Sequence, residues 1–298
     1  MKVSIIIPTY NRQAQLFQTL LKISKLEKQA DEVIIVDQSD NTVIGKKIIR
    51  TEYGVKYLKI PTANAQAARN YAARRASSRI LLFLDDDVDP EPGLVAAHLE
   101  NYLDVSIHAV AGFYLEPGES ETSQPRDGIW WRPLTQLEKY PASYSQRVDS
   151  PLWPSCNGSI RREVFLKLGG FDENYRYTLL DDTDLAVRMK RAGYRCVHDP
   201  RARLFHRKEP TGGNRPVKPG DRVIASREKW YTWFYFFWMN YGLTGVGEIY
   251  FRIRTNVFRR SYFTRPALLW LAVKEFCAGL GTAAGTIVKG RRLMFGTR

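Results

Sequence analysis

The chain contains 298 residues, of which 44% are hydrophobic and 26% are charged, a balance that argues against intrinsic disorder. At ~150 residues per domain, this length allows about two domains. The net charge of +14 lies in the last third, because residues 201–298 carry 19 basic and 5 acidic side chains, whereas residues 1–200 carry 26 of each. Cys156, Cys196 and Cys277 are widely spaced and form no C-x-x-C pair, which argues against a disulfide framework or a zinc site and indicates a reducing, cytosolic setting.

Residues 1–76 alternate strand patterns with helix patterns. The apolar runs at 3–8, 32–36 and 55–60 predict buried strands, and residues 13–29 and 63–76 predict helices. The first run is too short to be the apolar core of a signal peptide. Strands and helices in this order predict an α/β fold with a doubly wound, mostly parallel sheet. Because the sequence has no G-x-G-x-x-G or Walker motif, another feature must bind the phosphates if this half binds a nucleotide.

The stretch at 79–90, RILLFLDDDVDP, is the feature around which the rest of the chain is organised. Its apolar half predicts a buried parallel strand, and open α/β sheets bind ligands outside the carboxyl ends of such strands. Asp85, Asp86 and Asp87 follow the strand directly. Because carboxylates this close repel one another, a cation such as Mg²⁺ or Mn²⁺ would stabilise them. The alternative is a solvated acidic turn without a ligand.

Six short motifs occur in an order that resembles one known family. They are SIIIPTYNR at 4–12, VDQSD at 36–40, NAQAARNYA at 64–72, FLDDD at 83–87, GGFDE at 169–173 and LDDTDLAVRMKRAGY at 180–194. In this order they resemble the family-2 glycosyltransferases, which are inverting enzymes of the GT-A fold with a Rossmann-like nucleotide-binding half. The resemblance covers about residues 1–206.

The resemblance implies a role for each matching residue. The nucleotide site would use Pro8, Thr9, Asn11, Asp37, Arg69, Asp85 and Asp86. Within it, Asp37 would contact the base and Asp85 the ribose. Asp87 would bind the divalent metal, Mn²⁺ or Mg²⁺, on the sugar diphosphate.

The acidic helix that follows the GGFDE turn begins with Asp181 and Asp182, where the family often has Glu-Asp. Removing the proton of an acceptor hydroxyl requires a positioned carboxylate, and we expect Asp182 to be this base, with Asp181 as the alternative. Both could instead cap the helix, because Asp is favoured in first turns. On the acceptor side we expect Asn157 and Gly158, with Asp184 pointing either to the acceptor or into the structure.

His206 ends the region of resemblance. Family members often place a metal-binding histidine here, and imidazole would favour Mn²⁺ over Ca²⁺, but a lone histidine after a strand is often simply packed or solvated. Residues 210–220 have the composition of a mobile segment able to fold over a diphosphate, or of a plain linker. In the long loop at 116–150, Trp130 and Trp131 could stack on an acceptor sugar or form a local hydrophobic contact.

The C-terminal region differs from the rest in composition. We expect one GT-A domain over residues 1–215 and a basic, aromatic-rich helical extension over residues 216–298. Trp230–Tyr241, WYTWFYFFWMNY, has nine aromatics in twelve residues, which favours a membrane interface, although such a stretch could also pack on the catalytic domain or form an oligomer interface. The apolar stretch at 267–288 is interrupted by Lys274-Glu275, which favours an in-plane or core helix over a span.

Together these patterns predict an inverting, metal-dependent glycosyltransferase. The donor would be a UDP-, dTDP- or GDP-linked sugar, and the acceptor a glycan or a lipid-linked glycan. The enzyme would act in the cytoplasm, peripherally on the inner face of the membrane. The main alternative is an inactive module of the same fold that binds sugar nucleotides or polysaccharides. Binding of nucleic acid by the basic third is not expected, because no motif for it is present.

Overall fold

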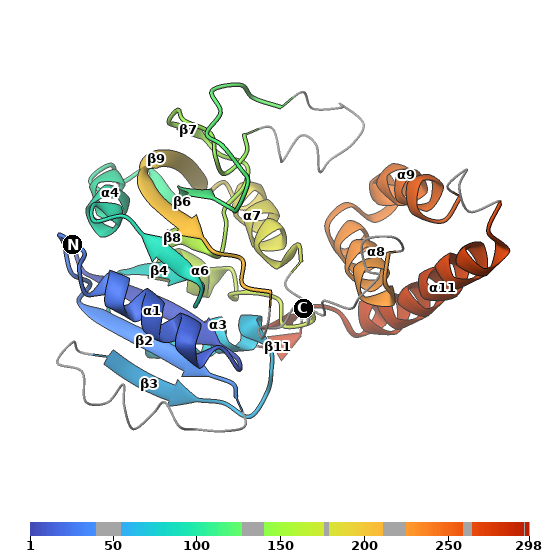
Figure 1. Cartoon of the computed structure of the whole chain (residues 1–298), viewed down its shortest axis with the longest axis horizontal. Helices are drawn as coiled ribbons and strands as arrows, with labels where there is room; N and C mark the ends of the chain where they lie inside the picture. The colour runs from blue at the N-terminus through green and yellow to red at the C-terminus, as the bar shows by residue number, and fades with distance from the viewer. Residues whose placement is uncertain are drawn as a thin grey trace.

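The computed structural model describes residues 1–39, 55–126, 140–175, 179–210, 225–258, 264–294 and 296–297. Trp130, Trp131 and residues 211–220, for which the sequence suggested roles, lie outside these ranges. Within them the chain forms one large mixed sheet covered by helices and a separate group of C-terminal helices (Figure 1).

The N-terminal half of the sheet is parallel, as predicted. β1 (Val3–Thr9) pairs with β2 (Glu32–Asp37) on one side and with β4 (Ile80–Leu84) on the other, and β3 (Val55–Lys59) forms the edge. Helices α1 (Gln13–Ile23) and α3 (Ala65–Arg75) connect these strands. β1 and β4 are buried along their whole length and are mostly apolar because both faces are covered, whereas the edge strand β3 is only partly buried.

The second half of the sheet is mixed. Its elements are β5 (Val88–Pro90), α4 (Leu94–Asn101), β6 (Ile107–Leu115), β7 (Val148–Asp149), β8 (Asn157–Arg161), α6 (Arg162–Lys167), α7 (Asp181–Arg191) and β9 (Arg195–His206). β8 runs antiparallel to β4 and β6, whereas β6 and β9 are parallel to each other. The strand order of the whole sheet is β3-β2-β1-β4-β8-β6-β9-β5, and β7 pairs with β9 beside this path.

Alternate residues of each central strand enter different cores. Ile5 and Leu82 pack in the core that includes α1 and α4, whereas Ile6 and Phe83 pack in the core that includes α3, α6 and α7. This alternation is what a period of two residues requires when both faces are buried. The two cores fix the strands, so the loops at their carboxyl ends have a rigid base.

The C-terminal region is helical, as predicted. It contains α8 (Arg227–Tyr241), a 3-10 turn η1 (Gly242–Gly245), α9 (Val246–Asn256) and α11 (Pro266–Lys289), followed by the short strands β10 (Arg292–Leu293) and β11 (Gly296–Thr297). Most aromatic side chains of α8 are buried among these helices and against α7, including Trp230, Tyr235, Phe236 and Phe237. The expectation that this stretch as a whole lies at a membrane is therefore wrong, and the packing alternative describes it.

Close packing of α8 and α11 depends on Gly279. A Cβ added to Gly279 would lie 2.4 Å from the Cβ of Trp230 and 2.8 Å from the backbone oxygen of Arg227. After α11 the chain returns to the sheet domain, where Met294 N donates a hydrogen bond to Gly169 O (2.8 Å). Residues 291–294 thus pack on the GGFDE turn of the first domain.

Candidate active site

The carboxyl end of β4 places three consecutive carboxylates in different environments. Asp85 is partly exposed, and its Oδ1 accepts a hydrogen bond from Arg69 Nη2 (2.7 Å). Asp86 and Asp87 are buried, and Thr9 Oγ1 donates to Asp86 Oδ2 (2.7 Å). Burial raises the pKa of Asp86 to about 7. Asp86 therefore holds the end of β1 through Thr9.

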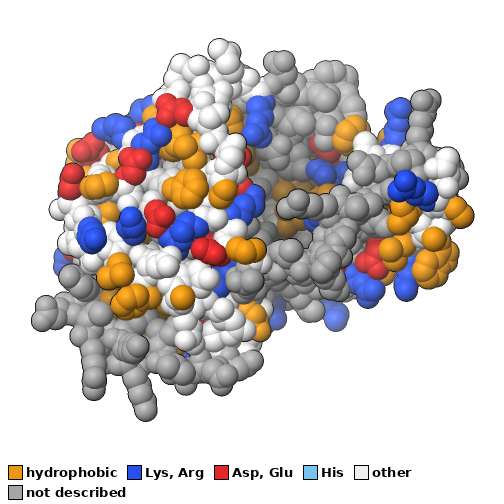
Figure 2. Space-filling view, in the orientation of Figure 1, with side chains coloured by type: hydrophobic (Ala, Val, Ile, Leu, Met, Phe, Trp, Pro, Cys, Tyr) orange, Lys and Arg blue, Asp and Glu red, His pale blue; other side chains and the backbone are white. Residues whose placement is uncertain are grey.

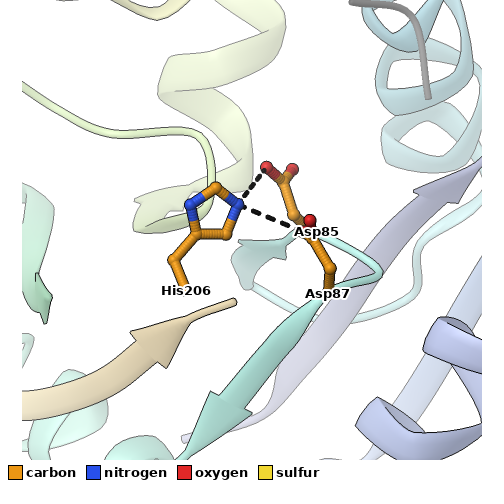
Figure 3. Close-up of side chains that lie close together, drawn as sticks. All are labelled: Asp85, Asp87 and His206. Atoms are coloured by element: carbon orange, nitrogen blue, oxygen red, sulfur yellow. Dashed lines mark hydrogen bonds and ion pairs between the residues drawn. The ribbon is translucent and has the colours of Figure 1, made fainter. Parts of the chain in front are cut away.

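Asp85, Asp87 and His206 converge on one point (Figure 3). His206 Nε2 lies 3.1 Å from Asp87 Oδ1 and 3.6 Å from Asp85 Oδ2, and all three potential ligand atoms lie within 4.8 Å of one another. Burial alone would lower the pKa of His206, but Asp87 and Glu116 raise it to about 9. For Asp87, burial is outweighed by His206 and Arg12, so its pKa falls to about 2.

These groups fit a divalent cation. Two carboxylate oxygens and one imidazole nitrogen suit Mn²⁺ or Mg²⁺, and the imidazole favours Mn²⁺. Asp87, Glu116 and Asp85 all raise the pKa of His206, so the surrounding carboxylates favour a positive charge at this point. A metal ion would take the place of that proton, because an imidazole ligand must be neutral.

The residues expected for the nucleotide gather at the ends of neighbouring strands. Thr9 and Asp37 are paired in the register of β1 and β2, and Pro8 precedes Thr9 in β1. Asn11 has a positive φ of 54° and is exposed, and its backbone N–H donates to Ser39 Oγ (2.7 Å). Asp37 is fully buried and accepts hydrogen bonds from the Tyr57 hydroxyl and from Ser39 N.

A cavity of about 400 Å³ lies in front of this edge of the sheet. Arg69, Asp85 and His206 line it from the nucleotide side. The other walls include Tyr114, Glu116, Tyr140, Ser150, Trp153, Ser155, Cys156, Leu180, Asp181, Asp182 and His198. The cavity therefore joins the metal-binding cluster to the start of α7.

Asp181 and Asp182 occupy the first turn of α7 but have different partners. Leu180 at the N-cap has a positive φ of 64° and forms no side-chain cap. Asp181 is buried and lies 3.5 Å from Arg69 Nη1, whereas Asp182 Oδ1 accepts from Thr183 N (2.7 Å) and its Oδ2 from Ser155 N (3.4 Å). Burial, and then repulsion between the two carboxylates, raise the pKa of Asp182. Asp182 also satisfies an amide of the first turn, so the capping and cavity-lining interpretations both describe it.

Three residues expected on the acceptor side do not line the cavity. Asn157 is fully buried in the sheet, where its Nδ2 donates to Phe113 O (2.8 Å) and Ala202 O (2.9 Å). A Cβ on Gly158 would lie 2.4 Å from Pro154 O, so this glycine admits the preceding loop and not a ligand. Residues 153–156 form the wall instead, because β8 begins only after them.

Asp184 also points away from the cavity. It is fully buried and forms ion pairs with Arg188 (2.8 Å) and with Arg291 (2.5 Å) from the C-terminal end of the chain. Asn240 Nδ2 of α8 donates to the same carboxylate (2.8 Å). Of the two expectations for Asp184, the structural one is correct and the acceptor one is wrong, because its carboxylate faces α8.

Two site residues were missed by the sequence argument. Arg12 Nη1 bridges Asp86 (3.2 Å) and Asp87 (3.0 Å), and its position inside the first motif was the available signal. Glu116 follows β6 directly and lies 3.5 Å from His206 Nδ1. This contact with His206 lowers the pKa of Glu116 to about 2. A carboxylate just after a buried strand was the signal for it, but the strand order that brings β6 beside β9 could not be read from the sequence.

Known proteins resemble this chain in sequence and in fold. A family model, described as glycosyl transferase family 2, matches residues 4–169. The uncharacterized glycosyltransferase YwdF of Bacillus subtilis is 29% identical over 224 residues, which cover 74% of this chain and 79% of that protein.

Two solved structures are similar at 16% identity. GalNAc-T7 with UDP, GalNAc and Mn²⁺ has a TM-score of 0.61 and covers 80% of this chain and 48% of its own. TarS 1–349 of S. aureus in complex with UDP-GlcNAc has a TM-score of 0.60 and covers 94% of this chain and 81% of its own. These similarities confirm the predicted GT-A fold.

Proposed function

The chain belongs to glycosyl transferase family 2, and from this premise we propose that it transfers a sugar from a nucleoside diphosphate donor to an acceptor hydroxyl with inversion. The observation that carries the proposal is the placement of Asp182 in the same cavity as Asp85 and His206. The cluster of Asp85, Asp87 and His206 can bind a metal ion on the donor diphosphate, while Asp182 lies at the start of α7 in another wall. In an inverting transfer the acceptor attacks the face of the donor sugar opposite the leaving diphosphate, so the base and the metal ion must lie in different walls of the cavity.

In the proposed mechanism Asp182 accepts the proton of the attacking hydroxyl. A general base works best when its pKa is close to the operating pH, and burial together with Asp181 moves the pKa of Asp182 upward from the usual carboxylate range. Asp181 interacts with Arg69, which also holds Asp85 on the donor side. This difference between the two carboxylates favours Asp182 as the base.

The metal ion, Mn²⁺ or Mg²⁺, would neutralise the charge that develops on the leaving diphosphate. Asp87 and His206 would hold it, with Asp85 beside it. Arg12 fixes Asp87 from behind by binding its Oδ2, so that Oδ1 faces His206. The Mn²⁺ in the GalNAc-T7 structure supports this choice of ion.

The donor would lie along the ends of β1, β2 and β4. We assign the base to the region of Pro8, Thr9, Asn11 and Asp37, and the ribose and phosphates to Arg69 and Asp85. UDP, dTDP and GDP all fit this description, and similar structures hold UDP, UDP-GlcNAc or GDP-Man. The acceptor would be a glycan or a lipid-linked glycan at the cytoplasmic face of a membrane.

A transfer assay tests the proposal. The purified full chain is incubated with UDP-, dTDP- and GDP-linked sugars and a panel of glycan acceptors, with Mn²⁺, Mg²⁺ or EDTA, and release of nucleoside diphosphate is measured. We expect release with one donor class, only with a divalent ion, and a product whose anomeric configuration is inverted by NMR. Undiminished release in EDTA would contradict the metal site. Donor binding without release under all conditions would instead support the inactive binding module.

A further inference from the structure

Helix α11 is apolar on the side that packs against α8 and also on a side that is exposed. It is 24 residues long, and its most apolar 18-residue window has a mean hydropathy of 1.3 and is only 17% buried. The packed side faces α8 through Ala272, Gly279 and Ala283, with Phe276 and Ile287 partly buried beside them. These five residues recur at intervals of four, three, four and four, which is the spacing of one helix face.

A second row of apolar residues runs along α11 on a neighbouring side and is exposed. Its members recur at intervals of three and four residues and are Trp270, Val273, Cys277, Leu280, Ala284 and Val288, which we call the α11 stripe. Trp270 is 64% exposed and Val288 is 88% exposed. Figure 2 shows hydrophobic side chains gathered on the outer side of the helical region, with Lys and Arg side chains next to them. No contact within the described residues accounts for this row.

The charges around the α11 stripe have one sign. Among the described residues of 225–294, the exposed charged side chains are all basic: Arg227, Arg254, Arg265, Lys274, Lys289 and Arg292. Of the three acidic residues in the same ranges, Glu228 is half-buried in the first turn of α8, Glu248 is fully buried and Glu275 is bound by Arg227. Lys274 also lies 5.1 Å from the ring centre of Trp270. The stripe is therefore surrounded by positive charge at its start, its middle and its end.

An apolar row with a Trp and flanking lysines is the pattern of a helix that lies in a lipid interface. A second copy of this chain would bring equal positive charges together, whereas an anionic lipid surface complements them. The packed side of α11 also opposes a spanning orientation, because the helix would have to leave α8 at Gly279. The charges therefore favour an anionic lipid surface, and the packing of α11 on α8 favours a helix that lies in the plane of that surface.

We propose that the α11 stripe docks in the plane of an anionic lipid surface, with Arg265, Lys274 and Lys289 at the level of the headgroups. The proposal deepens the membrane location given above and moves it from the buried aromatics of α8 to α11. It does not depend on sugar transfer, so either proposal can fail alone.

The test compares two matched double variants of the full chain. Leu280→Glu with Val288→Glu changes the α11 stripe, and Leu103→Glu with Val105→Glu makes the same changes at residues of the first domain that are 80% and 84% exposed. Co-sedimentation is measured with vesicles of phosphatidylcholine, with and without phosphatidylglycerol. We expect the wild type to bind only the anionic vesicles and to be released by salt. The stripe variant should bind about tenfold less or weaker still, as expected when apolar side chains no longer enter the lipid, and the Leu103/Val105 variant should bind as wild type.

Three results would overturn the proposal. They are no binding to anionic vesicles at low salt, equal binding to neutral vesicles, and equal losses in the two variants. Dimerisation of the wild type that only the stripe variant abolishes, without vesicle binding, would assign the stripe to a second copy instead. Transfer to a water-soluble acceptor, measured in parallel, should be unchanged in both variants, and its absence in the wild type would count against the proposed function alone.

Discussion

Asp181 and Asp182 are neighbours in the sequence, but their side chains have different partners. Both line the cavity, but Asp181 is buried against Arg69, whereas Asp182 accepts hydrogen bonds from the backbone amides of Thr183 and Ser155 and from the Thr183 hydroxyl. A base must be free to take a proton, and a carboxylate engaged with an arginine loses much of that capacity.

We predict that Asp182→Asn retains donor affinity and lowers kcat by ~10²- to 10⁴-fold, the usual contribution of a positioned base. Asp181→Asn should affect donor affinity more than kcat, because it releases Arg69. Steady-state kinetics and donor titration measure both effects. If Asp181→Asn is the inactive variant and Asp182→Asn is not, the two roles are reversed. In the wild type, the acid limb of kcat should lie above the usual carboxylate range, since burial and Asp181 raise the pKa of Asp182.

His98 lies in the core beside the sheet, and its burial makes the stability of the protein depend on pH. It is fully buried between Asn157 Oδ1 (3.0 Å) and Ser159 Oγ (2.9 Å), and burial lowers its pKa to about 4 from an ordinary 6.5. Between these values the unfolded chain binds a proton that the folded chain does not. The contribution of His98 to the free energy of unfolding is therefore fully present above pH 6.5. It is lost as pH falls toward 4, by up to about 1.4 kcal/mol per pH unit.

We predict that His98→Gln lowers the slope of the free energy of unfolding against pH by the contribution of one proton. Urea unfolding at several pH values measures it as the slope of the free energy of unfolding against pH. The absolute stability of the variant at pH 7 is not the readout, because the substitution also alters hydrogen bonds. A variant with the wild-type slope would show that His98 is protonated in the folded protein.

The metal cluster shows which residue-level features the sequence could predict. Asp87 and His206 were predicted as metal ligands because each follows a recognisable strand or motif, whereas Asp85 was predicted to contact the ribose and its place in the cluster was not. Asn157 and Gly158 were placed wrongly because the sequence showed a turn before GGFDE but not where β8 begins, and a shift of a few residues moves a side chain from the cavity wall into the core.

At the scale of elements, α7 is held from behind by the end of the chain. Arg291 is 9% exposed and forms ion pairs with Asp184 (2.5 Å) in α7 and with Asp172 (3.5 Å) in the GGFDE turn. Tyr235 of α8 donates a hydrogen bond to Asp172 (2.7 Å). One guanidinium thus joins the helix that carries Asp182 to the C-terminal helices.

We predict that Arg291→Ala destabilises the protein by about 3–5 kcal/mol, because buried Asp172 loses its paired arginine and buried Asp184 is left with Arg188. The matched control is Arg292→Ala, since the neighbouring arginine side chain is 67% exposed and pairs with Glu173 at 3.4 Å; its cost should be about 1 kcal/mol or less. Denaturant unfolding measures both. Equal effects of the two variants would show that the buried cluster contributes no more than a surface ion pair.

This element-level connection could not be predicted from the sequence. The aromatic run of α8 has the composition of a membrane interface, and composition alone does not say whether a partner helix covers it. The cover is α11, whose Gly279 permits close approach. Asp184 likewise belonged to an acidic motif, and only the return of Arg291 from 107 positions along the chain explains its burial.

For the whole molecule, the cluster of Asp85, Asp87 and His206 ties two distant parts of the sheet together. Asp85 and Asp87 lie in the β4–β5 turn, and His206 ends β9. A ligand that binds only the folded protein stabilises it by ~2.7 kcal/mol at 100 times its Kd. We predict that Mn²⁺ raises the Tm, that UDP raises it further only with Mn²⁺, and that Asp87→Ala removes both shifts. A thermal-shift series measures this, and Asp182→Asn is the control that should keep them.

Because residues 291–294 pack on the GGFDE turn, the C-terminal helices are attached to the sheet domain twice. One attachment is the chain that leads into α8, and the other is the contact made by residues 291–294. A single backbone cut introduced between Glu209 and Ala225 would open the covalent connection at one end only. The buried contacts of Arg291 and the Met294–Gly169 hydrogen bond would remain at the other. The two pieces should therefore co-elute in size-exclusion chromatography after such a cut and separate only on unfolding.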